Sequence, residues 1–248
     1  MALPAGYRLV AYDSIDSTNA EVARLARDGA PDGTVVRAKR QTAGRGRHGR
    51  KWDSPEGNLY CSLLLRPHVL PAEAAQITFV AALALGEALD GALPAGRLQL
   101  AFKWPNDVLL DGRKVAGILL ESSGIRKGRI DWLVVGCGLN VRHFPQHVSG
   151  YPATSLCDAG VTEPDVDGLL AAFVRAFALW RIRWQSEGLG PVREAWLARA
   201  GCIGGEITVR LPRDELRGRF VGLDGSGALL LDLPDGSRRT VTAGDVFF

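Results

Sequence analysis

Residues 98–121 read LQLAFKWPNDVLLDGRKVAGILLE, and this stretch indicates the type of sheet that the chain forms. Apolar or alternating runs flank Asp111-Gly112 and predict two strands joined by a two-residue hairpin, because these residues tolerate the positive φ angles of a tight turn. Leu98 to Lys103 and Ile130 to Val135 are further strand-like runs on either side. The stretch therefore predicts an antiparallel meander.

A helix start is predicted near the N-terminus. In Asp16-Ser17-Thr18-Asn19-Ala20-Glu21, Thr18 is expected to cap the first turn, with Glu21 three positions later. Thr34 to Ala38 and Asn58 to Arg66 are strand-like, and the Gly/Arg stretch between them has no periodicity. A loop is therefore expected to hang between two strands.

Two more helices are predicted further along. Apolar residues at helical spacing from Ile77 to Leu89 indicate a largely buried helix. A long amphipathic helix is expected from Thr162, with Pro164 in its first turn. Helices combined with a mixed, largely antiparallel sheet make an α+β fold.

The last part of the chain shows a different pattern of residues. Short β runs separated by Asp-Gly turns are found at Ile207–Leu211, Gly218–Leu223, Ala228–Leu233 and Thr240–Val246. They predict a small β-barrel. We therefore expect a main domain over residues 1–200 and a small C-terminal barrel over 201–248.

Composition describes an ordinary globular protein of 248 residues with a formal net charge of +3. Six basic residues and no acidic one lie between Lys39 and Lys51, which leaves 24 basic against 27 acidic residues elsewhere. The four cysteines form no C-x-x-C pair, so we expect reduced thiols and a cytoplasmic protein. No signal sequence or membrane span is expected, and no metal ligand is assigned to a protein residue.

The loop Gly44-Arg45-Gly46-Arg47-His48-Gly49 matches G-x-G-x-x-G, but its context argues against a dinucleotide-binding fingerprint. That fingerprint must open a helix, whereas here the chain continues through turn formers to Pro55. Glycines that carry arginines can wrap an anion and offer forked donors to phosphate, and Trp52 offers a flat face for adenine. A merely solvated basic loop would have the same composition.

Three other runs place polar residues at strand ends. Lys103-Trp104-Pro105-Asn106-Asp107 follows an apolar strand, Lys114-Val115-Ala116-Gly117 begins another, and Gly136-Cys137-Gly138-Leu139-Asn140 ends a third. Each also has a structural interpretation. Pro105 with Asn106-Asp107 is typical of a turn, a lone lysine is usually solvated, and a glycine turn can use an asparagine to bind backbone groups.

Taken in order, these pieces resemble the biotin protein ligase family, whose arginine loop reads G-R-G-R-x-G-R-x-W and is met here at every fixed position from Gly44 to Trp52. Ser17-Thr18-Asn19 and the three runs above complete the match. The resemblance implies a class II synthetase-like α+β catalytic domain followed by a small SH3-like barrel. The chain is similar to the short members of the family, which lack an N-terminal helix-turn-helix domain, because Ser17 lies too near the start of the sequence for such a domain to precede it.

The resemblance also implies ligand roles. The residues implied to hold biotin are Ser17, Thr18, Asn19, Gln41, Arg45, Gly46, Arg47, Lys114 and Gly117. The residues implied to face ATP or the adenylate are Arg47, Arg50, Trp52, Asn106, Lys114 and Asn140. Lys114 and Arg47 would neutralise phosphate charge during catalysis, and Asp107 would accept the proton of the attacking lysine.

The activity implied is ligation of biotin to a lysine of a biotin carboxyl carrier protein, through biotinyl-5′-AMP, with ATP and Mg²⁺. We expect no specific DNA and no membrane partner, and a monomer or weak homodimer. Two alternatives stay open: a lipoate or octanoate ligase or transferase of the same fold, and a non-enzymatic nucleic-acid-binding protein that uses the basic loop.

Overall fold

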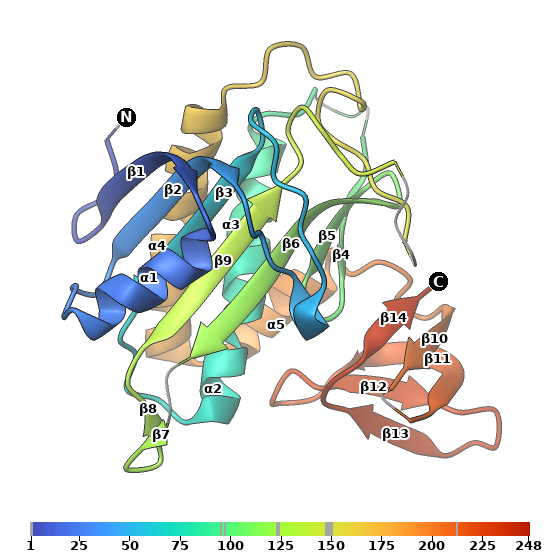
Figure 1. Ribbon diagram of the computed structural model, residues 1–248. Coiled ribbons are helices and arrows are strands. Elements are labelled where there is room, and N and C mark those ends of the chain that lie inside the picture. The colour runs from blue at the N-terminus through green and yellow to red at the C-terminus, as the bar shows by residue number, and fades with distance from the viewer. Residues whose placement is uncertain (1, 95, 97, 123–124, 147–150, 212) are drawn as a thin grey trace.

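A seven-stranded sheet forms the centre of the computed structural model, which describes residues 2–94, 96, 98–122, 125–146, 151–211 and 213–248 (Figure 1). The strand order is β1-β2-β3-β9-β6-β5-β4. The strands are β1 (Arg8–Ile15), β2 (Thr34–Gln41), β3 (Leu59–Leu65), β4 (Leu100–Lys103), β5 (Asp107–Leu110), β6 (Arg113–Ser122) and β9 (Leu133–Leu139). β1 and β2 pair in parallel, and the other neighbouring pairs are antiparallel. The α+β prediction is confirmed.

The predicted meander is β4-β5-β6, and the hairpin turn lies where expected. Asp111 and Gly112 have φ angles of 46° and 71°, the left-handed conformation that a two-residue hairpin requires. The run from Ile130 to Val135 is not one strand. Its first residue ends a short hairpin formed by β7 (Ile125–Arg126) and β8 (Arg129–Ile130), and β9 begins only at Leu133.

Helices cover both faces of the sheet. They are α1 (Thr18–Arg27), α2 (Pro71–Ala75), α3 (Ile77–Asp90), α4 (Val166–Glu187) and α5 (Leu189–Leu197). α1 packs Val22 and Ala26 onto one face, in a small core that includes Val36 of β2. The neighbouring Val35 belongs to the larger core with α3 and α4 on the other face, because successive side chains of a strand point to opposite sides.

Three details differ from the sequence predictions. β1 was not predicted, because this edge strand has mostly exposed side chains and gives no clear alternation. α4 begins at Val166 rather than Thr162, since Asp165 caps it by accepting a hydrogen bond from the Asp167 backbone N–H at 3.1 Å. α5 was also missed; it starts directly after Gly188, which ends α4 with a φ of 76°.

The segment Pro71–Asp90 is apolar and long enough to cross a membrane by composition alone, but 67% of its most apolar window is buried inside the protein. Its residues from Ile77 onward contribute heavily to the larger core. The segment is therefore explained as α2 followed by the buried helix α3 of this fold.

A second sheet follows α5 in the order β13-β12-β11-β10-β14. Its strands are β10 (Glu206–Arg210), β11 (Glu215–Leu223), β12 (Leu229–Asp232), β13 (Arg238–Val241) and β14 (Asp245–Phe247), all paired antiparallel. The predicted run Thr240–Val246 is divided between β13 and β14. These two strands are the outer ones and do not pair with each other in the described residues, so the predicted barrel is an open sheet.

Candidate functional site

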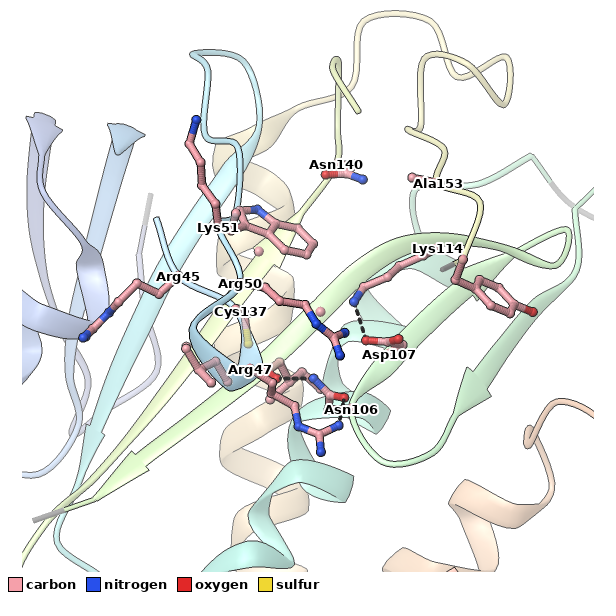
Figure 2. Close-up of a pocket in the computed structure, with 18 of the residues that line it drawn as sticks. Arg45, Arg47, Arg50, Lys51, Asn106, Asp107, Lys114, Cys137, Asn140 and Ala153 are labelled. Atoms are coloured by element: carbon pink, nitrogen blue, oxygen red, sulfur yellow. Dashed lines mark hydrogen bonds and ion pairs between the residues drawn. The ribbon is translucent and has the colours of Figure 1, made fainter. Parts of the chain in front are cut away.

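A cavity of about 620 Å³ lies between the central sheet, the loop that joins β2 to β3, and the end of the second sheet. Figure 2 shows Lys114, Asp107, Arg50 and Arg47 around it. All fourteen residues implicated by the sequence line this one cavity: Ser17, Thr18, Asn19, Gln41, Arg45, Gly46, Arg47, Arg50, Trp52, Asn106, Asp107, Lys114, Gly117 and Asn140. Segments from four parts of the chain thus meet at one place.

Two lysines enclose a buried carboxylate at one side of the cavity. Asp107 is 8% exposed; its Oδ2 lies 2.9 Å from Nζ of Lys103, and its Oδ1 lies 2.5 Å from Nζ of Lys114. Burial by itself raises the pKa of Asp107, but the two ammonium groups outweigh burial and hold the pKa below the ordinary value. Asp107 is therefore an ionised carboxylate at neutral pH and orients Lys114.

The turn between β4 and β5 joins the two sheets. Trp104 precedes a cis peptide bond to Pro105, and its indole N–H donates to the carbonyl of Gly227, 3.1 Å away in the turn between β11 and β12 of the second sheet. Asn106 donates to the Ile118 carbonyl at 2.7 Å, so its amide is fixed against β6. The turn expected from Pro105 is present, and it also carries residues into the cavity.

The arginine loop reaches the second sheet. Arg47 donates to Oδ1 of Asn106 at 3.0 Å and to the Gly244 carbonyl. Asp245 forms an ion pair with Arg50 and lies 3.7 Å from Arg47. One carboxylate of β14 therefore faces two guanidinium groups of the loop.

The glycine pattern of this loop does not open an α-helix. Arg47–Gly49 forms a single 3-10 turn in which His48 has a φ of 56°, and Arg50 is already extended. The prediction that this glycine pattern is not a dinucleotide-binding fingerprint is confirmed, because the loop places no helix N-terminus where a pyrophosphate could bind.

Trp52 covers two glycines of the sheet. A Cβ on Gly138 would lie 2.7 Å from the indole, and one on Gly117 would lie 3.1 Å from it. The Lys114 ammonium lies 5.4 Å from the ring centroid, within the range of a cation–π contact. The glycines of β6 and β9 therefore make room for a flat ring beside a cation.

A chain of hydrogen bonds connects further residues of the cavity lining. Oε1 of Gln41 accepts from the Thr18 backbone N–H at 2.8 Å and from its hydroxyl at 3.1 Å. The Gln41 amide donates to Ser54 at 2.9 Å. Ser17, not Thr18, is the N-cap residue of α1, without a side-chain cap bond. The predicted Thr18 cap is wrong because its hydroxyl is used by Gln41.

Two of the implicated amides are already engaged by the protein. Asn19 is buried and donates to Glu121 at 2.7 Å, while its Oδ1 accepts from Ser62 at 2.6 Å. Asn140 is 2% exposed and donates to the Thr154 carbonyl at 3.0 Å. Each amide thus fixes neighbouring segments, whatever else it touches.

Several residues of this region were not found from the sequence. Ser62 and Glu121 stand in apolar strands that give no functional signal, and Asp245 lies in a short run that was read as barrel. Their partners are distant in sequence: 43 positions separate Ser62 from Asn19, and 195 separate Asp245 from Arg50. Only the folded chain brings them together.

Comparison with known proteins assigns the family. Residues 11–140 match the Biotin/lipoate A/B protein ligase family, and residues 202–248 match the Biotin protein ligase C terminal domain. The biotin–[acetyl-CoA-carboxylase] ligase of Paracoccus denitrificans is 45% identical over 245 residues, which span 94% of this chain and 97% of that protein. The bifunctional ligase/repressor of Bacillus subtilis is 34% identical over 96% of this chain and 73% of its own length.

The fold agrees with this assignment. Biotin protein ligase from Aquifex aeolicus, solved in complex with biotin and ATP, aligns with a TM-score of 0.80 at 30% identity and with 97% of each chain covered. Full-length similarity in sequence and in structure, together with one cavity lined by the motif residues, leads to one conclusion. This chain belongs to the biotin protein ligase family.

Proposed function

We propose that the cavity binds biotin and ATP side by side, joins them as biotinyl-5′-AMP, and passes biotin to a lysine of a biotin carboxyl carrier protein. One observation carries this proposal: Arg47 and Arg50 of the arginine loop and Lys114 of β6 converge on a cavity of about 620 Å³. That volume is within the usual range of small-molecule sites. We place the phosphates of ATP beside these cations and biotin at the end of the cavity lined by Ser17, Thr18 and Gln41.

The end of the cavity proposed for biotin carries neutral polar groups apart from Arg45, which pairs with Glu121. The Gln41 amide donates one hydrogen to Ser54, which leaves its second hydrogen available, and the Ser17 hydroxyl also lines the cavity. Thr18, Asn19, Arg45, Gly46 and Gly117 complete this end. Neutral donors fit the uncharged ring system of biotin, and its carboxylate would then extend toward Lys114 and Arg47.

The cationic end suits the nucleotide. Arg47 and Arg50 offer forked donors to phosphate oxygens, and Trp52 offers a ring face. Asn106 accepts a hydrogen bond from Arg47, and Asn140 lies at the upper side of the site in Figure 2. A bound polyphosphate would compete with Asp245 for Arg50, which is the more exposed of the two arginines.

The first step forms a bond between a biotin carboxylate oxygen and the α-phosphorus of ATP, and pyrophosphate leaves. An anion must approach a polyanion, so the fixed charges of Lys114, Arg47 and Arg50 lower the barrier. In the second step the lysine amine of the carrier attacks the acyl carbon, AMP leaves, and the amine proton passes to a base or to water. Asp107 is a weak base for this proton, because Lys103 and Lys114 stabilise its ionised form.

Magnesium would enter with the phosphates of ATP, whose charge it neutralises. The carboxylates of Asp107 and Asp245 in the cavity are already bound to cations. Within the residues that the structure describes, no group of three or more His, Cys, Asp or Glu side chains could hold an ion. The protein side chains therefore do not fit a cage of their own for the metal.

A transfer assay tests the proposal. Purified protein is incubated with radiolabelled biotin, ATP, Mg²⁺ and a biotin carboxyl carrier domain, and lipoate replaces biotin in a parallel sample. We expect label on the carrier lysine with biotin only, and loss of roughly 10²-fold or more of adenylate formation in Lys114→Ala. Transfer of lipoate but not biotin would refute the biotin assignment, and an unimpaired Lys114→Ala would refute the role of Lys114.

A further inference from the structure

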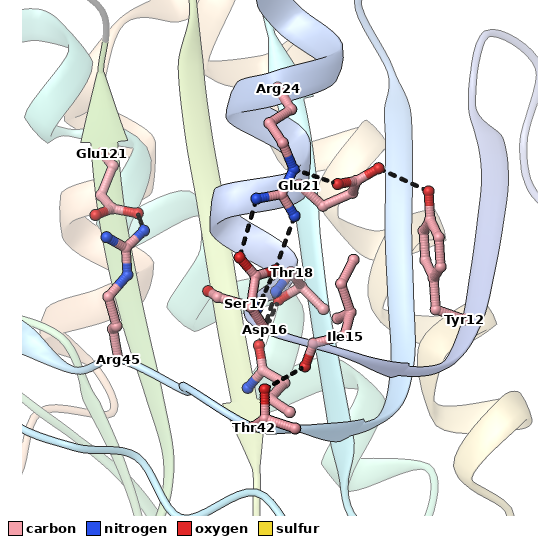
Figure 3. Close-up of polar contacts among 11 residues, drawn as sticks. Tyr12, Ile15, Asp16, Ser17, Thr18, Glu21, Arg24, Thr42, Arg45 and Glu121 are labelled. Carbon is pink, nitrogen blue, oxygen red and sulfur yellow. Dashed lines mark hydrogen bonds and ion pairs between the residues drawn. The ribbon is translucent and has the colours of Figure 1, made fainter.

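We infer that Glu121 is a positioning residue of the biotin end, because one of its carboxylate oxygens holds both the start of α1 and the arginine loop. Oε2 accepts from the Asn19 amide at 2.7 Å. The same oxygen accepts from Arg45 at 3.1 Å, and Figure 3 shows Arg45 and Glu121 facing each other. Asn19 and Arg45 belong to different segments. The inference rests on the proposed function insofar as it concerns biotin, but its geometric part does not depend on the ligand.

Asn19 is held from three sides. Ser62 on β3 donates to Oδ1 at 2.6 Å, and Glu121 on β6 accepts from Nδ2. On β9, a Cβ at Gly136 would lie 2.0 Å from Asn19 Oδ1, so glycine is needed there for the amide to fit. Both polar atoms of Asn19 are consumed in this way. Asn19 therefore connects the start of α1 to the sheet through hydrogen bonds.

The arginine loop is tied to the same point. Thr42 and Ala43 donate their backbone N–H groups to the carbonyls of Ile15 and Asp16, at 2.9 and 2.8 Å, so the loop starts beside the residues that precede α1. Arg45 then turns away from the cavity centre toward Glu121 (Figures 2 and 3). Glu121 thereby fixes the distance between the two walls of the biotin end.

Glu121 is not itself a residue that lines the cavity, whereas Asn19 and Arg45 are. Its effect must therefore pass through them. Glu121→Gln keeps an oxygen that accepts from Asn19 but loses the charge that attracts Arg45. Glu121→Ala loses both contacts. The two variants separate the two connections, and Glu187→Gln is the matched control, since Glu187 pairs with Arg183 on the surface of α4.

Hydrogen–deuterium exchange of the ligand-free protein tests the geometric part. Peptides that cover residues 42–51 should exchange faster in Glu121→Gln, and peptides that cover 17–22 should in addition exchange faster in Glu121→Ala. Glu187→Gln should match the wild type in both. If both segments of Glu121→Ala exchanged at the same rate as in the wild type, the inference would be overturned, even if biotin binding or activity had changed.

Steady-state kinetics test the consequence for biotin. Glu121→Ala should raise the KM for biotin roughly tenfold and leave kcat at saturating substrates and the KM for ATP within about threefold, as expected for lost uniform binding. In an Asn19→Ala background the added effect should be smaller, because interacting residues are not additive. An unchanged KM for biotin, or full additivity, would overturn the positioning role. A different result would separate the two proposals. If the Glu121 variants exchanged faster than the wild type, but the wild type transferred no biotin, the proposed function would fail and the geometric inference would stand.

Discussion

The ammonium group of Lys114 lies 2.5 Å from the carboxylate of Asp107, so the cation proposed to meet the phosphates is held by a buried anion. Lys103 binds the other oxygen of the same carboxylate. The three groups carry one net positive charge between them, which prepares the site for an anion. Asp107 thus matters first as the group that fixes Lys114, and this role can be separated from that of a base.

Asp107→Asn should slow adenylate formation more than transfer. The substitution leaves Lys103 and Lys114 without their counter-charge and lets Lys114 move, and breaking such a buried pair costs about 3–5 kcal/mol of stability. Pyrophosphate release and single-turnover transfer from synthetic biotinyl-adenylate would be measured side by side. If transfer slowed more than synthesis, Asp107 would be the base for the attacking lysine after all.

Asp245→Asn should release the arginine loop in the absence of ligand. Arg50 then loses its ion pair and Arg47 its nearby carboxylate, so trypsin should cut faster within residues 45–51. Biotin plus ATP should protect the wild type and the variant alike. Asp232→Asn is the control, since Asp232 pairs with Arg238 within the second sheet. Equal cleavage of all three unliganded proteins would argue against the proposal that Asp245 holds the arginine loop.

Gly138→Ala should weaken the binding of ATP by displacing Trp52. The new Cβ would lie 2.7 Å from the indole, so the ring must shift. We expect a rise in the KM for ATP of about tenfold, equivalent to about 1.4 kcal/mol. Gly225→Ala, where a Cβ meets nothing within 4 Å, should behave as the wild type. An unchanged KM for ATP in Gly138→Ala would remove Trp52 from the nucleotide site.

Asp16→Asn should lower stability in a manner that depends on pH. Hydrogen bonds from Arg24 lower the pKa of Asp16 from 3.8 to about 2 (Figure 3). A depressed carboxyl pKa contributes stability that is complete above the unfolded value and is lost as pH falls. The difference in unfolding free energy between wild type and variant should therefore be constant above pH 3.8 and shrink between pH 3.8 and about 2. Urea denaturation across this range measures it, and a difference independent of pH would contradict the assignment.

Some features could be predicted from short stretches of sequence. Asp111-Gly112 specified its hairpin because a two-residue turn depends on the φ angles of two neighbouring residues. The ordered motifs around Arg47, Asp107 and Lys114 indicated the family and named residues that line a single cavity. These signals are local: each lies within a few consecutive residues, so the sequence displays them directly.

Other features depended on contacts between distant segments. β1 was missed because most of its side chains are exposed and only a few, such as Val10 and Tyr12, pack against the smaller core. The second sheet stays open because β13 and β14 do not pair in the described residues. The motif names Asn19 as a residue of the biotin site, but it does not show that the Asn19 amide donates to Glu121, 102 positions away. Hydrogen bonds and ion pairs of this kind need two side chains within about 3–4 Å. The sequence by itself determined which residues are candidates for the chemistry. Only the tertiary structure decided which of them bind one another, because that proximity arises when the helices and strands pack.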